Sequence, residues 1–86
     1  MLFEGILKLE SLDECYKFFE DLCTINELHS LAQRFEVASL LNDGKTYLQI
    51  ASITHASTAT ISRINRALEY GADGYKIIFD KISKLK

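Results

Sequence analysis

The chain has 86 residues, of which 48% are hydrophobic and 26% charged, and its formal net charge is −2. A chain of this length forms one small domain, 1–86, with room for only a modest core, so sharing a core with a second copy is an option. Its apolar content excludes a disordered tail. Its acidic balance excludes a protein that coats nucleic acid through overall charge, but it leaves room for a local basic patch.

The chain shows no sign of a membrane or secreted protein. Its opening, MLFEGILKLE, carries an early acid and no cleavage-type segment, and no apolar run approaches the roughly 20 residues that span a bilayer. We therefore expect a cytoplasmic protein with no membrane partner. Cys15 and Cys23 have neither redox nor zinc spacing, so we expect reduced, mostly buried thiols.

Capped apolar stripes predict two helices in the N-terminal half. Ser11 and Glu14 form a capping-box pattern that begins a helix over about 11–23, and Thr24 and Glu27 repeat it at the start of a longer helix. That longer helix runs to the NDG at 42–44. Its expected apolar stripe consists of Leu28, Leu31, Phe35, Ala38 and Leu41.

Three shorter helices are predicted in the C-terminal half. Thr46 can cap a helix to about Ile53, and Ser57 can cap another that Gly71 ends through the flexibility of glycine at that position. Asp73 precedes a last helix over about 74–85. No segment alternates cleanly enough to predict a strand, so we expect an all-α fold of five or six helices. The apolar side chains expected to face inward from the 46–53 helix are Leu48, Ile50, Ala51 and Ile53.

The 46–70 segment has the pattern of a DNA-binding helix-turn-helix. Only THA separates its two helices, a length that sets them at a steep angle. Ala51 is small enough for a close helix crossing, and Ile61 and Ile64 follow where the second helix needs buried anchors. His55 stands where glycine is common because of a positive φ, which histidine tolerates better than most residues.

If Ile61, Ile64 and Leu68 face inward, small and basic side chains lie on the outer side of the second helix. Thr58, Ala59 and Ser62 would then discriminate bases, because hydroxyls contact base edges and an alanine methyl contacts thymine. The other residues of the predicted DNA-binding site are Lys45, Thr46, Gln49, Ser57, Thr60, Arg63 and Arg66, with Lys45, Thr46, Gln49 and Arg66 holding the backbone.

Other functions find less support in the sequence. The same segment could be an αα-corner in a helical bundle, with Ser57 as a cap and the arginines as solvated surface. A helical protein-protein interaction module without DNA binding is the main alternative function. Enzymatic activity is not expected, because no residues form a catalytic set, and His29 and His55 with the two cysteines form no metal-ligand set.

From about Thr24 to Gly71 the sequence resembles the Trp repressor family, and more closely its short, Trp-repressor-like YerC/YecD branch. The segments responsible are TINELHSLAQRFEVASLLNDGKTYLQIAS and ASTATISRINRALEYG, followed by GYKIIF. The resemblance implies an intertwined homodimer whose core is built by the N-terminal helices, 11–42, with a helix-turn-helix head on each side. It also implies a transcriptional regulator, most often a repressor, that binds palindromic double-stranded DNA.

The resemblance also suggests where a corepressor would bind. The threonine and two arginines that hold tryptophan in the family's namesake match Thr24, Arg34 and Arg63. However, Ile64 replaces a glycine and Ala67 replaces a serine of that pocket, and both changes fill or depolarise it. The sequence therefore argues against tryptophan, and it leaves open a regulator without a cofactor or one that responds to another small molecule.

Overall fold

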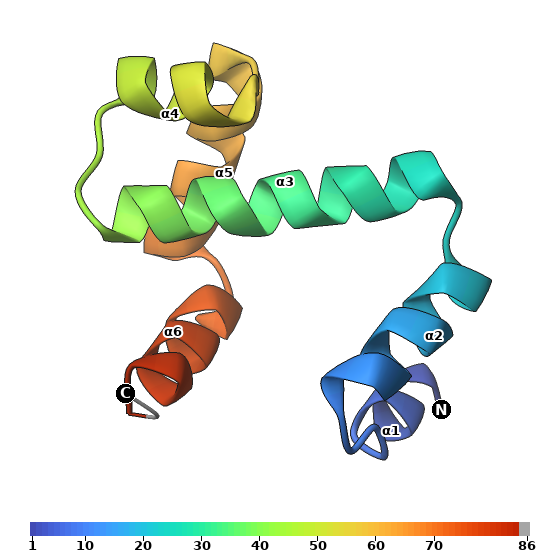
Figure 1. Ribbon diagram of the computed structural model, residues 1–86. Helices are drawn as coiled ribbons and strands as arrows, with labels where there is room; N and C mark the ends of the chain where they lie inside the picture. Colours follow the sequence, from blue (N-terminus) through green and yellow to red (C-terminus); the bar gives the residue numbers. More distant parts are fainter. Residues whose placement is uncertain (85–86) are drawn as a thin grey trace. The chain divides into compact units, whose positions relative to one another are not determined.

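A computed structural model of the protein describes residues 1–84 and divides the chain into two compact units, Met1–Leu31 and the part from Ala32 onwards. The described residues contain helices and no strand (Figure 1), which confirms the predicted all-α fold. The helices are α1 (Leu2–Ile6), α2 (Leu12–Leu22), α3 (Ile25–Asn42), α4 (Tyr47–Thr54), α5 (Thr58–Tyr70) and α6 (Gly74–Lys84). The predicted end of the last helix at 85 lies outside the described residues. None of these helices is both long and apolar enough to cross a bilayer.

The helix cap of the first unit follows the predicted pattern, except that one of its hydrogen-bond donors lies one residue earlier in the chain. The hydroxyl of Ser11 accepts from the N–H of Glu14 at 3.1 Å, as expected at the start of α2. The Glu14 carboxylate, however, accepts from the N–H of Glu10 at 2.8 Å and not from Ser11 itself. The short helix α1 precedes this turn and had no capping signal of its own in the sequence.

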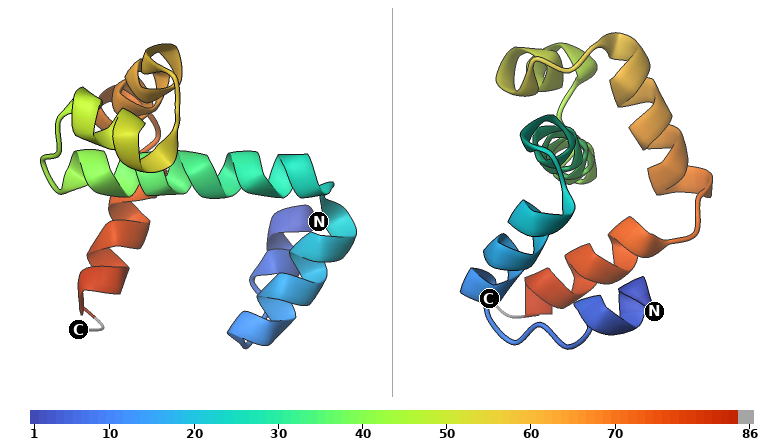
Figure 2. Two further views of the ribbon diagram at one scale, coloured as in Figure 1. Left: turned by 45° about the horizontal axis from the view of Figure 1, so that its top comes forward. Right: turned by 90° about the vertical axis from the view of Figure 1, so that its right-hand side faces the viewer.

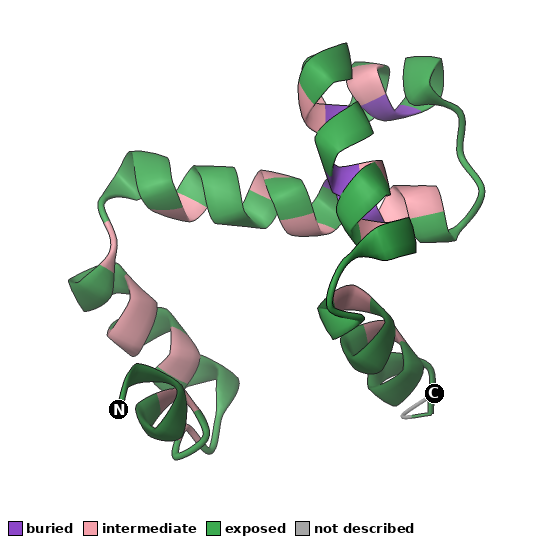
Figure 3. Cartoon of the chain, turned by 180° about the vertical axis from the view of Figure 1, so that it is seen from behind, coloured by how far each residue is buried: buried purple, intermediate pink, exposed green. Residues whose placement is uncertain are grey.

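The first unit has no buried residue (Figure 3). Leu12 and Tyr16 of α2 and Phe3 of α1 are each more than half exposed. Cys15 and Cys23 form no disulfide with each other, and both are half-buried where the sequence predicted mostly buried thiols. The apolar face of α2 is thus only partly covered by the residues of its own unit.

Helix α3 contributes to both units, and its ends are closed by local hydrogen bonds. At the start, Thr24 and Glu27 bond reciprocally, with distances of 2.8 and 3.1 Å, which confirms the predicted capping box. At the end, Gly44 has a φ of 85°, and the N–H groups of Gly44 and Lys45 donate to the carbonyls of Leu41 and Leu40. This left-handed turn stops the helix and redirects the chain into α4.

The core of the protein lies in the second unit, where α3, α4 and α5 meet. In Figures 1 and 2, α5 runs past the C-terminal half of α3, with α4 at one end of α5 and α6 at the other. Tyr75 and Phe79 of α6 pack against this core, and Phe35 meets both rings edge-on. The buried residues are Val37, Ala38, Ile50, Ala56, Ile61 and Ile64.

The inward faces predicted for α3 and α4 are only partly correct. Leu31 of the predicted α3 stripe is exposed, while Val37, outside that stripe, is fully buried. Leu48 and Ile53 of α4 were expected to face inward, and both are exposed. The side of α4 that meets the core is formed by Ile50, which is fully buried, and by Ala51, which is half-buried.

Gly71 ends α5 for a different reason from the one predicted. Its φ of −85° lies outside the left-handed region, so the predicted use of its flexibility is wrong. A Cβ at this position would instead lie 2.3 Å from the carbonyl oxygen of Ala67. The chain returns so tightly onto the last turn of its own helix that only glycine fits here.

Candidate nucleic-acid interface

The turn between α4 and α5 is held by three short-range hydrogen bonds. His55 has a φ of 61°, which confirms the predicted left-handed conformation, and its N–H donates to the carbonyl of Ala51 at 2.9 Å. The hydroxyl of Thr54 donates to the carbonyl of Ile50 at 2.8 Å and accepts from the N–H of Ala56 at 3.2 Å. The turn is therefore a defined structure and not a loose connection.

A hydrogen bond from α3 fixes the end of α4. The side-chain amide of Gln33 donates to the carbonyl oxygen of Thr54 at 3.1 Å in a partly buried position. That carbonyl belongs to the last turn of α4, where no intrahelical donor remains. The bond thus orients the α4–α5 pair on α3.

Buried isoleucines set the angular position of α5. Ile61 is fully buried and Ile64 is 4% exposed, and both pack against Ile50 of α4 and residues of α3. Ala51 is half-buried against the same core, as a close helix crossing requires. These contacts confirm the predicted anchors and turn the opposite face of α5 outward.

The outward face of α5 begins with a capped helix end. The hydroxyl of Ser57 accepts from the N–H of Thr60 at 3.1 Å and donates to the Thr60 hydroxyl at 3.0 Å. These two predicted DNA contacts are thus occupied in forming the cap. The N–H groups of Thr58 and Ala59, at the free end of the helix, remain directed outward for an acceptor.

Beyond this cap, small and basic side chains share one exposed surface, which we call the α5 outer face. It consists of Thr58, Ala59, Ser62, Arg63 and Arg66, all exposed as predicted. Four of them, from Ala59 to Arg66, line a shallow hollow of about 240 Å³ without an acidic side chain. The surface therefore combines low steric bulk with two positive charges.

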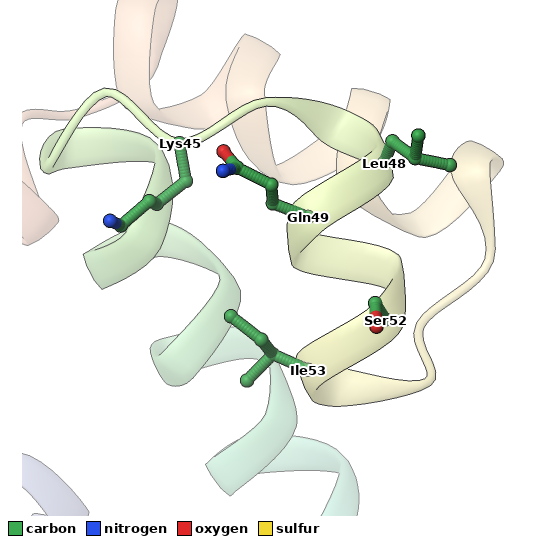
Figure 4. Close-up of a pocket in the computed structure, with 5 residues that line it drawn as sticks. All are labelled: Lys45, Leu48, Gln49, Ser52 and Ile53. Carbon is green, nitrogen blue, oxygen red and sulfur yellow. The ribbon is translucent and has the colours of Figure 1, made fainter.

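The start of α4 carries the other predicted backbone contacts. Thr46 and Gln49 form a complete capping box, in which the Gln49 side-chain oxygen accepts from the Thr46 N–H at 2.9 Å. This bond leaves the Gln49 amino group available as an outward donor. Lys45 and Gln49 line a hollow of about 320 Å³ together with Leu48, Ser52 and Ile53 (Figure 4).

The residues matched to a corepressor site have separate local roles. Thr24 caps α3 through its hydroxyl and belongs to the first unit. Arg34 and Arg63 are exposed and belong to the second unit, and Arg63 lines the α5 hollow.

Ile64 is packed in the core, and Ala67 lines an apolar cavity of about 370 Å³ with Phe35 and Tyr75. Among residues 1–84, no three acidic, histidine or cysteine side chains are grouped as metal ligands.

Comparison with known proteins decides the family. A family model described as Trp repressor protein matches residues 1–83. The chain belongs to the Trp repressor family. The uncharacterized protein YerC of Bacillus subtilis (strain 168) is 57% identical over 83 residues, which cover 96% of this chain and 80% of YerC.

Two crystal structures of similar proteins share the fold. A TrpR-like protein from Eubacterium eligens ATCC 27750 superposes with a TM-score of 0.92 and 61% identity, covering 95% of this chain and 84% of that protein. A proposed Trp repressor from Staphylococcus aureus gives a TM-score of 0.91 and 51% identity, covering 95% of this chain and 82% of that one. The Trp repressor family is a family of regulators and not of enzymes.

Proposed function

We propose that this member of the Trp repressor family is a sequence-specific transcriptional regulator, a repressor in the cytoplasm, that binds double-stranded DNA through α4 and α5 as a helix-turn-helix. The observation that carries the proposal is the α5 outer face. Two arginines and three small side chains are exposed there, while the opposite side of α5 is anchored in the core by Ile61 and Ile64. Such a helix can enter the major groove without steric obstruction.

Each part of this surface has a separate role in the proposal. Thr58, Ala59 and Ser62 lie at the start of α5 and contact base edges, where hydroxyls hydrogen-bond and the alanine methyl meets thymine. Arg63 and Arg66 neutralise phosphates, which makes binding depend on salt. Lys45, Thr46 and Gln49 at the start of α4 bind the backbone, with the free amino group of Gln49 as a donor.

We propose that the regulator is a homodimer, because the first unit cannot be stable as it stands. A helical segment that covers its apolar side chains only in part gains little burial against its loss of conformational entropy. A second copy provides the missing cover for α1 and α2. A two-fold dimer also places one copy of α5 on each half of a palindromic site. Two copies of this short helix then select the DNA sequence more strongly than one copy does.

We further propose that tryptophan is not a corepressor. Ile64 occupies the core at the position of the family's pocket glycine, and Ala67 offers no hydroxyl to a ligand. The proposed regulator therefore binds DNA without a cofactor, and Arg63 is free to contact phosphate. Another small ligand would act at a site of different chemistry.

The test is selection of bound duplexes from a random DNA pool by the purified protein, with and without tryptophan. We expect a two-fold symmetric motif that is the same in both conditions. A motif obtained only with tryptophan would contradict the cofactor-free proposal, and no enrichment in either condition would favour a protein-protein interaction module instead.

The Ala59→Leu variant then tests whether α5 reads the motif. Ala59 is exposed, so a larger side chain leaves the fold intact but clashes with a base edge in the groove. We expect a changed sequence preference and not merely weaker binding. An unchanged preference would exclude Ala59 from the reading surface.

A further inference from the structure

Leu48 is an unusually exposed leucine in the folded second unit. It is 84% exposed, more than any other large apolar residue in the described part of that unit. Ile50, two residues further along α4, is fully buried, so the helix itself is firmly packed. The exposure of Leu48 therefore reflects the face of α4 on which it lies and not disorder of the helix.

This leucine lies at the end of α4 assigned to the DNA backbone. The capping box uses the N–H groups of Thr46 and Gln49, so the N–H groups of Tyr47 and Leu48 are the ones left to bind a phosphate at the start of α4. Figure 4 shows that Leu48 extends from the first turn of α4 in the direction opposite to Lys45 and Gln49. A phosphate held by this helix end thus has the leucine beside it.

The chemistry of the major groove offers Leu48 one apolar partner among the base edges. The C5 methyl of thymine projects into the groove, whereas the other base-edge groups are hydrogen-bond donors and acceptors. A leucine has no donor or acceptor, so it gains from a methyl and loses against an exposed polar edge.

We propose that Leu48 contacts the thymine methyl of a base pair flanking those read by α5 and so determines part of the DNA specificity. This inference rests on the proposed function. It adds α4 as a second reading element and selects thymine by its methyl group. An apolar protein partner would be a different use of the same side chain, and the experiment below separates the two.

The test compares thymine with uracil, which lacks only the C5 methyl. Each thymine of the selected duplex is replaced in turn by uracil, and the affinities of the wild type and of Leu48→Ala are measured. For the wild type we expect binding about fourfold weaker at one flanking position in each half-site, the effect of one buried methyl. For Leu48→Ala we expect weaker binding to the thymine duplex and no loss on uracil replacement there.

Ile53→Ala is the matched control, because Ile53 is also an exposed apolar residue of α4 but lies on the side of Gln49 in Figure 4. This variant should keep the wild-type ratio between thymine and uracil. Circular dichroism should show all three proteins folded, since both substituted side chains are exposed.

The outcomes separate this inference from the proposed function. If Leu48→Ala keeps the wild-type uracil effect at every thymine, or the wild type shows none at a flanking position, the inference is overturned while DNA binding stands. If no duplex is selected at all, the proposed function fails and the inference with it.

Discussion

The side-chain amide of Gln33 in α3 donates a hydrogen bond of 3.1 Å to the carbonyl oxygen of Thr54 at the end of α4. The two residues are 21 positions apart, so this bond is a tertiary contact that joins the long helix to the turn before α5. It makes the orientation of the reading helix depend on a residue outside the α4–α5 pair.

Removing this bond should weaken the fold measurably. We expect Gln33→Met, which keeps most of the side-chain volume, to lower the free energy of unfolding by about 1 kcal/mol, because the Thr54 carbonyl loses its donor. Gln33→Glu should cost more, since a carboxylate would face the carbonyl oxygen. Urea denaturation measures both, and equal stability of the wild type and Gln33→Met would show that the bond contributes nothing.

The two arginines of the α5 outer face should control the salt dependence of DNA binding. Replacing both Arg63 and Arg66 by alanine removes two phosphate contacts from each protomer and four from the proposed dimer, so the magnitude of the slope of log affinity against log salt should fall by about 3.6. The charge-matched control is Lys81→Ala with Lys84→Ala in α6, away from the proposed surface. Fluorescence anisotropy at several salt concentrations gives the slopes, and similar slopes for both double variants would show that binding follows net charge alone.

Replacing His55 by glycine should stabilise the protein. His55 adopts a φ of 61°, where a Cβ is unfavourable, and glycine relieves this strain. Glycine also gives the unfolded chain more conformational entropy, which offsets part of the gain in stability. We expect a gain of up to about 1 kcal/mol in thermal or urea unfolding. His55→Val should instead lower stability, because a β-branched residue fits this conformation poorly. The reverse order of the two variants would contradict the strain described here.

Disrupting the uncovered face of α2 should abolish the proposed dimer. Tyr16 is exposed within its own chain, so Tyr16→Glu should matter only if a second copy covers it. We expect the wild type to sediment at twice the chain mass and Tyr16→Glu to sediment as a monomer with reduced helix content. Glu20→Gln, a change at another exposed position of α2, should remain dimeric. A wild-type monomer at micromolar concentration would exclude the dimer.

The capping box of α3 should add a pH dependence to stability. Hydrogen bonding from the backbone N–H of Thr24, and secondarily from its side chain, holds the pKa of the Glu27 carboxyl below its ordinary value of 4.5. Since the folded pKa is the lower one, this contribution is present above pH 4.5 and is lost as the pH falls through the folded pKa.

The Glu27→Gln variant isolates this effect, because glutamine keeps an acceptor for the Thr24 N–H but cannot titrate. We expect it to be less stable than the wild type at neutral pH, with the difference shrinking towards acid. Urea midpoints measured across this range give the difference, and a gap that is constant with pH would exclude Glu27 as its source.

Features set by neighbours in the chain were predictable from the sequence. The reciprocal bonds of Thr24 with Glu27, the caps at Ser11, Thr46 and Ser57, and the positive φ of His55 each depend on residues at most four positions apart. Helix type and approximate bounds follow from such local chemistry. The outward face of α5 was also predictable, because thirteen residues with apolar anchors at helical spacing define one buried side.

The sequence by itself thus determined an all-α chain, its capped helices and the residues that α5 turns outward. Only the tertiary structure decided that Leu48 and Ile53 remain exposed and that Gln33 bonds to Thr54. The physical reason is that a short apolar helix can bury any of several stripes. The choice among them depends on the helices packed against it, which residue spacing within that helix does not specify.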